Sequence, residues 1–199
     1  MTDDASSSKR ESGDDRRVAI ALAARRVIID KGLEGLRTRD IAAAVGINIA
    51  TLHYHVPSKE ALIALVAESL RHDFKAQAMR HPRDGKTGIE RLHLEFDDFR
   101  ETVRDMPDLV VVLTELIARA RRDPIVAQIM IPMREFWKDQ IADVFRLGIA
   151  DGSFRADIDP DAAALIITGA LSDCWRRTDM SPALLDQLLA ELERAFIPK

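Results

Sequence analysis

The stretch from residue 38 to residue 55 contains two helical patterns that are too short to be stable alone. Thr38–Val45 and Ile49–His55 each place apolar residues at helical spacing, and Gly46 lies between them. Helices this short need support, because few backbone hydrogen bonds offset the cost of nucleation. A longer helical pattern, about Asp14–Asp30, precedes them and supplies a surface to pack on. The stretch therefore predicts a helix-turn-helix.

The rest of the chain also follows a helical pattern. Apolar residues recur at three-to-four spacing, and no segment alternates convincingly as a strand does. Further helices are expected to begin near Ser58, Thr87, Pro107, Pro124, Pro160 and Ser181, which are capping residues or prolines suited to a first turn. The sequence thus predicts an all-α chain of nine helices, with a three-helix head followed by a larger helical domain.

Charge is divided unevenly along the chain. The formal net charge is -4, yet residues 16–60 hold eight Lys or Arg and four acidic residues, which gives this segment a charge of +4. The remainder therefore carries -8. This asymmetry is expected when one end of a protein meets phosphates, although an excess of four charges also arises by chance.

Composition bounds the class of protein. Hydrophobic residues make up 47% of the chain, as in ordinary globular proteins, and no apolar run reaches the roughly 18 residues that span a bilayer. The polar start, residues 1–13, is predicted to be a disordered tail without a secretory segment. Cys174 is the single cysteine, which excludes an internal disulfide and fits a reducing compartment. We therefore expect a cytoplasmic protein with no membrane partner.

The sequence around the two short helices carries a specific resemblance. The run RTRDIAAAVGINIATLHYHVPSKEAL resembles the DNA-binding segment of TetR-family transcriptional regulators. The family pattern has an initial Thr, an Ile-Ala pair followed by Gly, and a closing run Thr-Leu-Tyr-Tyr-His-Phe-x-Ser-Lys-Glu-x-Leu. Matches fall at Thr38, Ile41, Ala42, Gly46, Thr51, Leu52, Tyr54, His55, Ser58, Lys59, Glu60 and Leu62. Departures are Asn48, His53 and Val56.

The resemblance implies which residues face DNA. Phosphate contacts are expected from Thr38, Thr51, Tyr54, His55 and Lys59, and base contacts or helix positioning from Asn48, Ile49, Ala50 and His53. Arg37 and Arg39, which flank Thr38, complete the predicted DNA-facing set. The alternatives are that Thr38 and Ser58 are only helix caps, and that Tyr54 and His55 are ordinary packing residues.

The resemblance also implies an architecture and a mode of action. A helix-turn-helix DNA-binding domain is expected at residues 14–74, and an effector-binding and dimerisation domain at residues 75–199. The segment GSFRADIDPDAAA is similar to the corresponding connection in many family members, those of BetI type included. The expected function is repression at a near-palindromic double-stranded operator, relieved by an unidentified small molecule. Activation, or a helical small-molecule-binding protein without repressor function, are the alternatives.

A homodimer is expected to form through the eighth and ninth helices. The apolar faces proposed for it contain Ile166, Ala170, Leu171 and Cys174 on the eighth helix, and Leu185, Leu188, Leu189, Leu192 and Phe196 on the ninth. Effector-binding residues are expected among Phe96, Phe99, Met133, Trp137 and Trp175. The spacing of these aromatic and methionine residues fits an ordinary core equally well.

Signatures of catalysis are absent from the sequence. It contains no G-x-S-x-G, H-E-x-x-H, P-loop or dinucleotide-binding glycine pattern, so we expect no enzyme activity and no cofactor. No metal site is expected either. His53 and His55 point to nearly opposite sides of a helix, and His93 with Asp97 more readily forms a solvated pair. Cys174 is either a redox sensor or an inert core residue.

Overall fold

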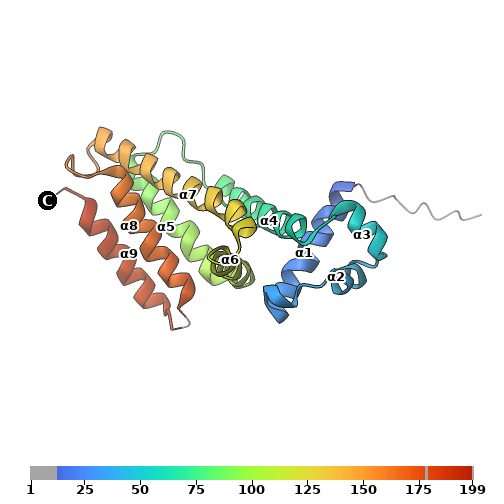
Figure 1. The fold of residues 1–199 in the computed structure, drawn as a ribbon. Coiled ribbons are helices and arrows are strands. Elements are labelled where there is room, and N and C mark those ends of the chain that lie inside the picture. The colour runs from blue at the N-terminus through green and yellow to red at the C-terminus, as the bar shows by residue number, and fades with distance from the viewer. Residues whose placement is uncertain (1–12, 178, 199) are drawn as a thin grey trace, which may run out of the picture. The chain divides into compact units, whose positions relative to one another are not determined.

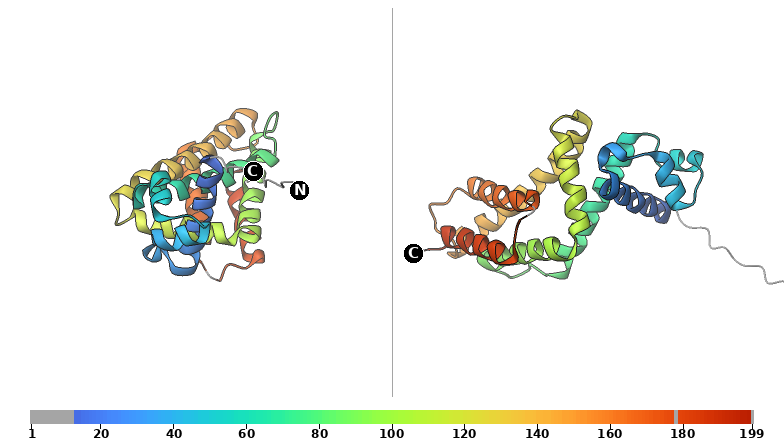
Figure 2. Two further views of the ribbon diagram at one scale, coloured as in Figure 1. Left: turned by 90° about the vertical axis from the view of Figure 1, so that its right-hand side faces the viewer. Right: turned by 90° about the horizontal axis from the view of Figure 1, so that it is seen from below.

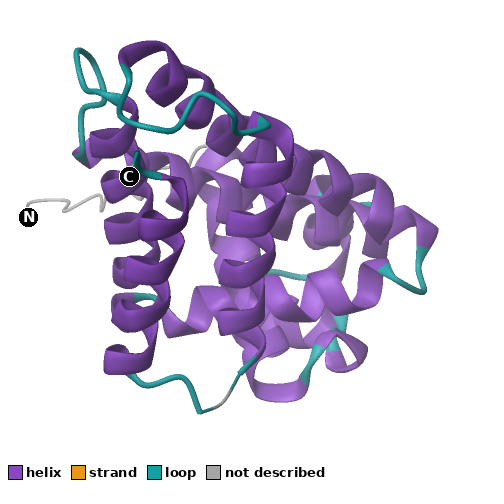
Figure 3. Cartoon of the chain, turned by 90° about the vertical axis from the view of Figure 1, so that its left-hand side faces the viewer, coloured by secondary structure: helices purple, strands orange, loops and turns teal. Residues whose placement is uncertain are grey.

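The computed structural model describes residues 13–177 and 179–198. Within these ranges the chain forms nine α-helices, one 3-10 turn and no strand (Figure 3). The helices are α1 (Gly13–Lys31), α2 (Thr38–Val45), α3 (Ile49–His55), α4 (Lys59–Arg80), α5 (Gly88–Asp105), α6 (Pro107–Ala120), α7 (Pro124–Asp151), α8 (Pro160–Arg176) and α9 (Pro182–Phe196), with η1 (Leu33–Gly35) after α1. The predicted all-α, nine-helix fold is confirmed.

Two predictions concern the disordered tail and the lack of membrane-spanning segments. The predicted tail lies outside the described residues except for Gly13, which begins α1. Among the described helices, none combines the length and the hydropathy that crossing a membrane requires.

Local capping signals set most helix starts. The Ala61 backbone N–H donates to Ser58 Oγ at 3.1 Å, so Ser58 caps α4 as predicted. Thr87 and Glu90 form a complete capping box at the start of α5. Thr38 is different, because Arg37 occupies the cap position of α2 and makes no side-chain cap bond. The cap-only alternative for Thr38 is therefore wrong.

The chain divides into two compact units within α4, between Ser69 and Leu70. We call the part up to Ser69 the N-terminal unit and the part from Leu70 the C-terminal unit. In the N-terminal unit, α2 packs on α1 and α3 packs on α2 (Figure 1). Ile20 and Ala24 of α1, Ile41 of α2 and Leu52 of α3 are all fully buried. These contacts stabilise the two short helices, which lack enough internal hydrogen bonds of their own.

In the C-terminal unit, α5, α7, α8 and α9 share one hydrophobic core. Phe145 lies at its centre, with ring centroids 4.9 Å from Phe154 and 4.7 Å from Phe196. Helix α9 runs beside α5 and α8 (Figures 1 and 2), and Arg100 of α5 is 2.8 Å from Asp186 of α9. The core therefore reaches from α5 to the last residue of α9.

Two glycines allow α5 and α7 to approach closely. A Cβ atom on Gly88 would overlap the backbone of Gly148, and a Cβ on Gly148 would overlap the ring of Phe154. The start of α5 is also fixed by hydrogen bonds, because the Gly88 N–H donates to Asp151 Oδ2 at 2.7 Å. The Ile89 N–H donates to Ser153 Oγ at 3.2 Å. A larger residue at position 88 would force α5 away from α7, and one at position 148 would displace the ring of Phe154.

The residues expected to form a dimer interface are largely buried within the single chain. Leu171 and Cys174 of α8, and Leu185, Leu189, Leu192 and Phe196 of α9, all belong to the core of the C-terminal unit. These six side chains are therefore not available to a partner chain. Ala170 and Leu188 are half-buried beside the same core, and Ile166 is 54% exposed, next to Leu165 at 64%. On α9, Leu184 is 42% exposed. A dimer through α8 and α9 stays a prediction.

Candidate nucleic-acid interface

The turn between α2 and α3 is fixed by backbone geometry. Gly46 has φ +71°, a left-handed conformation that favours glycine, although a Cβ there would meet no atom. The Gly46 N–H donates to the Ala43 carbonyl at 3.2 Å, and the Ile47 N–H donates to the Ala42 carbonyl at 2.9 Å. These bonds close the end of α2. The chain therefore reverses direction within a few residues of Val45.

Helix α3 starts at a side-chain cap. The Thr51 N–H donates to Asn48 Oδ1 at 2.7 Å, so Asn48 caps the helix. This hydrogen bond engages Oδ1 of the Asn48 side chain and fixes the plane of the side-chain amide. Asn48 is therefore placed to orient α3, with its amide NH₂ group left at the surface.

The two faces of α3 differ sharply. Leu52 is fully buried, whereas Ile49, Ala50, His53 and Tyr54 are exposed. We call these four residues the open face of α3. Positions three and four apart on a helix are neighbours, so the four side chains form one continuous surface. Three of the predicted base-facing residues lie together on it.

Tyr54 and His55 differ in how far they protrude. Tyr54 is 84% exposed, so the packing alternative for this residue is wrong. His55 is half-buried, and its ring meets that of Tyr54 edge-on at 5.2 Å between centroids. Thr51 is also half-buried, on the side of α3 that turns toward α1.

Arg17 anchors the end of α3. Its Nη1 donates to the backbone carbonyl of His55 at 3.0 Å, across 38 residues of sequence. The carbonyls in the last turn of a helix have no partner within that helix, so a cation suits this position. Sequence reasoning counted Arg17 among the basic residues but gave it no role. The basic composition of α1 was the available signal, and it does not say which carbonyl an arginine reaches.

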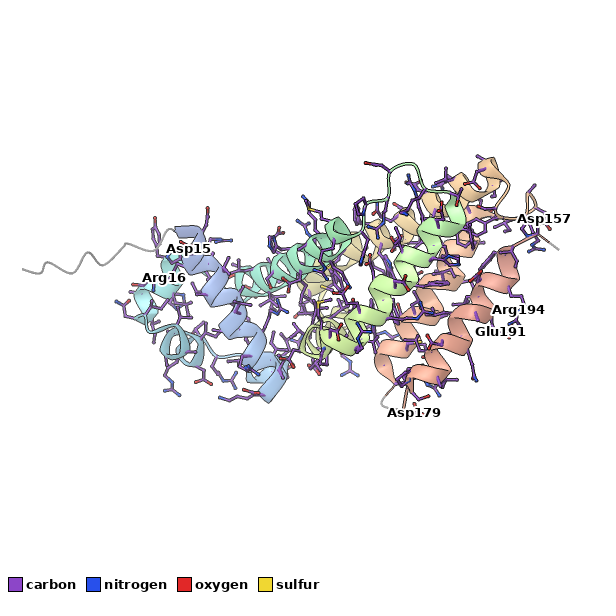
Figure 4. The ribbon with its side chains drawn as sticks, turned by 180° about the vertical axis from the view of Figure 1, so that it is seen from behind. Asp15, Arg16, Asp157, Asp179, Glu191 and Arg194 are labelled. Carbon is purple, nitrogen blue, oxygen red and sulfur yellow. The ribbon has the colours of Figure 1, made fainter. Side chains whose placement is uncertain are left out.

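A surface hollow of about 500 Å³ lies between the start of α1 and α3. It is lined by Gly13, Arg16, Gly46, Ile47, Asn48, Thr51 and His55. Arg16 is labelled on the first turn of α1 in Figure 4. The hollow thus groups a cation with two residues, Thr51 and His55, that were predicted to contact phosphates.

Further cations stand at the starts of neighbouring helices. Arg37 and Arg39 are exposed at the start of α2, beside the half-buried Thr38. Lys59 is the exposed first residue of α4, where backbone N–H groups already favour an anion. Lys31 is instead held by Asp40 at 2.7 Å, and this hydrogen bond lowers the pKa of the Asp40 carboxyl. Lys31 is therefore occupied within the unit.

Three of the five residues predicted to bind an effector contact one another. Phe99, Trp175 and Trp137 form a continuous stack, with centroids 5.3 Å apart at each step. Phe96 is buried in the core of the same unit, and Met133 is half-buried one helical turn before Trp137. Nε1 of Trp175 is buried and has no hydrogen-bond partner. Buried donors are normally paired, so this N–H marks a place where an acceptor is missing.

One group of described residues has metal-ligating atoms close together: His81, Asp98 and Glu101. Arginines already bond to its carboxylates, Arg80 to Glu101 and Arg83 to Asp98. His81 Nδ1 lies 2.8 Å from Asp98 Oδ1. The group is therefore an ion-pair network that joins the end of α4 to α5.

A second carboxylate on α5 belongs to the same network. Arg83 Nη2 also donates to Glu95 Oε1 at 2.8 Å. Burial raises the pKa of Glu95, and Arg83 opposes that rise. The positive charge of Arg83 thus offsets the negative charges of Glu95 and Asp98, which share a poorly solvated site.

The roles considered for His93 and Cys174 are tested by the contacts of these residues. His93 lies 3.0 Å from Glu193 and Asp97 bonds to Arg100, so the expected pair of His93 with Asp97 does not form. Cys174 is buried in the core, and burial raises the pKa of its thiol. Reactive cysteines need the thiolate, so this environment favours the inert reading over the redox sensor.

Known proteins resemble the chain in sequence and in fold. The family model described as bacterial regulatory proteins, tetR family, matches residues 20–66. The HTH-type transcriptional repressor KstR2 of Rhodococcus jostii (strain RHA1) is 26% identical over 152 residues, which cover 74% of this chain and 72% of the relative. The HTH-type transcriptional regulator EthR of Mycolicibacterium smegmatis is 33% identical over 97 residues, 46% and 45% of the two chains.

A solved structure supports the fold. A TetR-family transcriptional regulator from Rhodococcus sp. superposes with a TM-score of 0.81 at 22% identity, over 91% of this chain and 98% of that one. At this identity the likeness concerns the fold alone. The relatives and this neighbour are described as regulators of transcription, not as enzymes.

Proposed function

We propose that the chain is a DNA-binding regulator of the TetR family, which represses transcription until a small molecule releases it from its operator. The open face of α3, held on α1 and α2 with its apolar side buried, is the observation that carries the proposal. A short helix of this kind fits a major groove. The relative KstR2 is a transcriptional repressor, which supports repression over activation.

The proposed DNA contacts fall into two sets. Ile49, Ala50 and His53 face base edges, and Asn48 positions the helix. Arg37, Thr38, Arg39, Thr51, Tyr54, His55 and Lys59 face phosphates. Exposed cations at the starts of α2 and α4 support the second set, because a backbone phosphate meets both a positive charge and free N–H groups there.

A near-palindromic operator requires two copies of α3, about 34 Å apart or somewhat more. We place the dimer interface on the exposed apolar surface of α8, with Leu165, Ile166 and Gly169, and on Leu184 of α9. A Cβ on Gly169 would meet no atom of its own chain, so another helix has room to approach. This patch replaces the buried residues expected from the sequence.

The effector is proposed to bind in the C-terminal domain, residues 75–199, beside the stack of Phe99, Trp137 and Trp175. The unpaired indole N–H of Trp175 supports a ligand with a hydrogen-bond acceptor. An effector shifts the population toward conformers whose two α3 helices do not match the operator, and only by its affinity difference between conformers. The protein acts in the cytoplasm, where its operator lies.

The proposed function is tested by selecting bound fragments from genomic DNA with the purified chain. We expect enrichment of near-palindromic sites, with an affinity that falls steeply as salt rises. A compound that is processed by the products of neighbouring genes should release the DNA. A chain that ignores every duplex in dilute buffer would overturn the proposal and favour a helical small-molecule-binding protein.

A further inference from the structure

We propose that α3 selects its half-site mainly through the 5-methyl groups of thymine, contacted by Ile49 and Ala50. The inference rests on the proposed function, because it needs α3 in a major groove. It adds the class of base that the open face selects. Thymine is the one base that presents a methyl group in that groove.

The open face of α3 is apolar where it first meets DNA. Ile49 is the first residue of the helix and is 45% exposed, and Ala50 beside it is exposed as well. At 45% exposure, Ile49 leaves nearly half of its apolar side chain in contact with water. Against a thymine methyl, the same surface removes apolar area from water on both partners.

The open face lacks the side chains that read purines strongly. Arg and Lys bind guanine with two hydrogen bonds, and Asn and Gln bind adenine in the same way, but none of these residue types lies among Ile49, Ala50, His53 and Tyr54. Asn48 cannot form the two-bond contact with adenine, because its Oδ1 accepts the Thr51 N–H at 2.7 Å and only its NH₂ group is left to donate. His53 offers one directed bond at a time to a base edge.

The nearby cations do not supply the missing contacts to purine bases. Arg37 and Arg39 lie at the start of α2, and Lys59 lies at the start of α4. Contacts to phosphates fix register and orientation and carry no sequence information directly. Sequence discrimination by contact therefore depends mainly on Ile49 and Ala50, with single hydrogen bonds from His53 and from the Asn48 NH₂ group as smaller contributions.

The test uses the full chain and duplexes in which single thymines are replaced by deoxyuridine, which lacks only the methyl group. After selection of the best operator, we expect at least one thymine in each half-site where this replacement weakens binding about fourfold, as for loss of one buried methyl. In the Ile49→Ala variant the same replacement should change the dissociation constant less than about twofold, because the partner surface is already gone.

Controls separate this contact from general effects. His53→Ala should retain the full response to deoxyuridine, and Ile49→Val should retain much of it. Deoxyuridine outside the half-sites should have no effect. If a selected operator is bound tightly but no thymine responds, or if Ile49→Ala and the unmodified chain respond equally, methyl reading is wrong while the proposed function stands. If no sequence is enriched at all, the proposed function fails first and the inference fails with it.

Discussion

The two units use their cations differently. In the C-terminal unit, arginines are paired with carboxylates of the same unit, as Arg83 is with Glu95 and Asp98 at 2.8 Å. Further pairs join Arg100 to Asp97 and Asp186, Arg146 to Asp143 and Asp161, and Arg194 to Glu191, the last two residues being labelled in Figure 4. Exposed pairs of this kind contribute little to stability, but they neutralise the surface.

In the N-terminal unit, several cations face solvent at helix starts instead. Arg39 and Lys59 are exposed there, and Arg37 donates to the backbone carbonyl of Glu34 rather than to a carboxylate. Arg39 and Lys59 thus face solvent at helix starts, whereas the arginines named above for the C-terminal unit are ion-paired. The net charge of the whole chain, -4, therefore says little about whether the protein binds DNA. The local arrangement decides which surface attracts phosphate.

The largest expected effect concerns packing in the C-terminal unit. Gly88→Ala should lower the free energy of unfolding by about 3 kcal/mol, because the new methyl would overlap the backbone of α7. Chemical denaturation followed by circular dichroism measures this. Gly13→Ala in α1, where a Cβ would meet no atom, is the matched control and should change stability by less than about 0.5 kcal/mol. Equal stability of the two variants would contradict the close approach of α5 and α7.

The next effect concerns the proposed dimer. Leu165→Glu should convert the dimer to a monomer in sedimentation experiments and weaken operator binding at least about 100-fold, because two linked half-sites are then bound singly. Gln128→Glu adds the same charge at an exposed position of α7 and should leave both properties unchanged. A Leu165→Glu protein that stays dimeric would remove α8 from the interface.

A smaller effect tests the difference in charge between the units directly. Lys59→Ala should reduce the salt dependence of operator binding by about one phosphate contact, so that the loss of affinity between about 50 and 200 mM salt shrinks roughly threefold. Lys75→Ala removes an equally exposed lysine from the part of α4 in the C-terminal unit and should leave the slope unaltered. If both variants shift the slope alike, DNA does not distinguish the two units by charge.

The smallest effect concerns the anchor of α3. Arg17→Ala should cost about 1 kcal/mol of stability, the usual contribution of one hydrogen bond, measured by thermal unfolding. Arg17→Lys keeps a long cationic donor and should recover part of the loss. A lysine variant as unstable as the alanine variant would show that the contact to the His55 carbonyl is not what stabilises this end of α3.

Helix ends were predictable from the sequence because their signals are local. Gly46 and Asn48 act within three residues of their own positions, and α2 and α3 begin and end where the sequence predicted. The exposure of Ile49, Ala50 and His53 agrees with the resemblance, which implied that these residues face DNA.

The faces of the last helices were not predictable in the same way. A leucine stripe such as Leu185–Phe196 has the same spacing whether it packs on its own chain or on a partner. The structure resolves the ambiguity through α5 and α7, which are far away in sequence. Arg17 escaped prediction for a related reason, because its partner carbonyl is 38 residues distant and nothing local marks it. Residues whose role depends on a remote partner need the fold first.

The stack in the C-terminal unit has a practical consequence. Trp137 and Trp175 are the only tryptophans of the chain, and they touch each other. Tryptophan emission from the unlabelled protein therefore originates from a single spot, beside the indole N–H that lacks an acceptor. Quenching or a wavelength shift of the tryptophan emission on mixing with a compound would locate that compound without any dye, whereas contacts between α3 and DNA involve Tyr54 and no tryptophan.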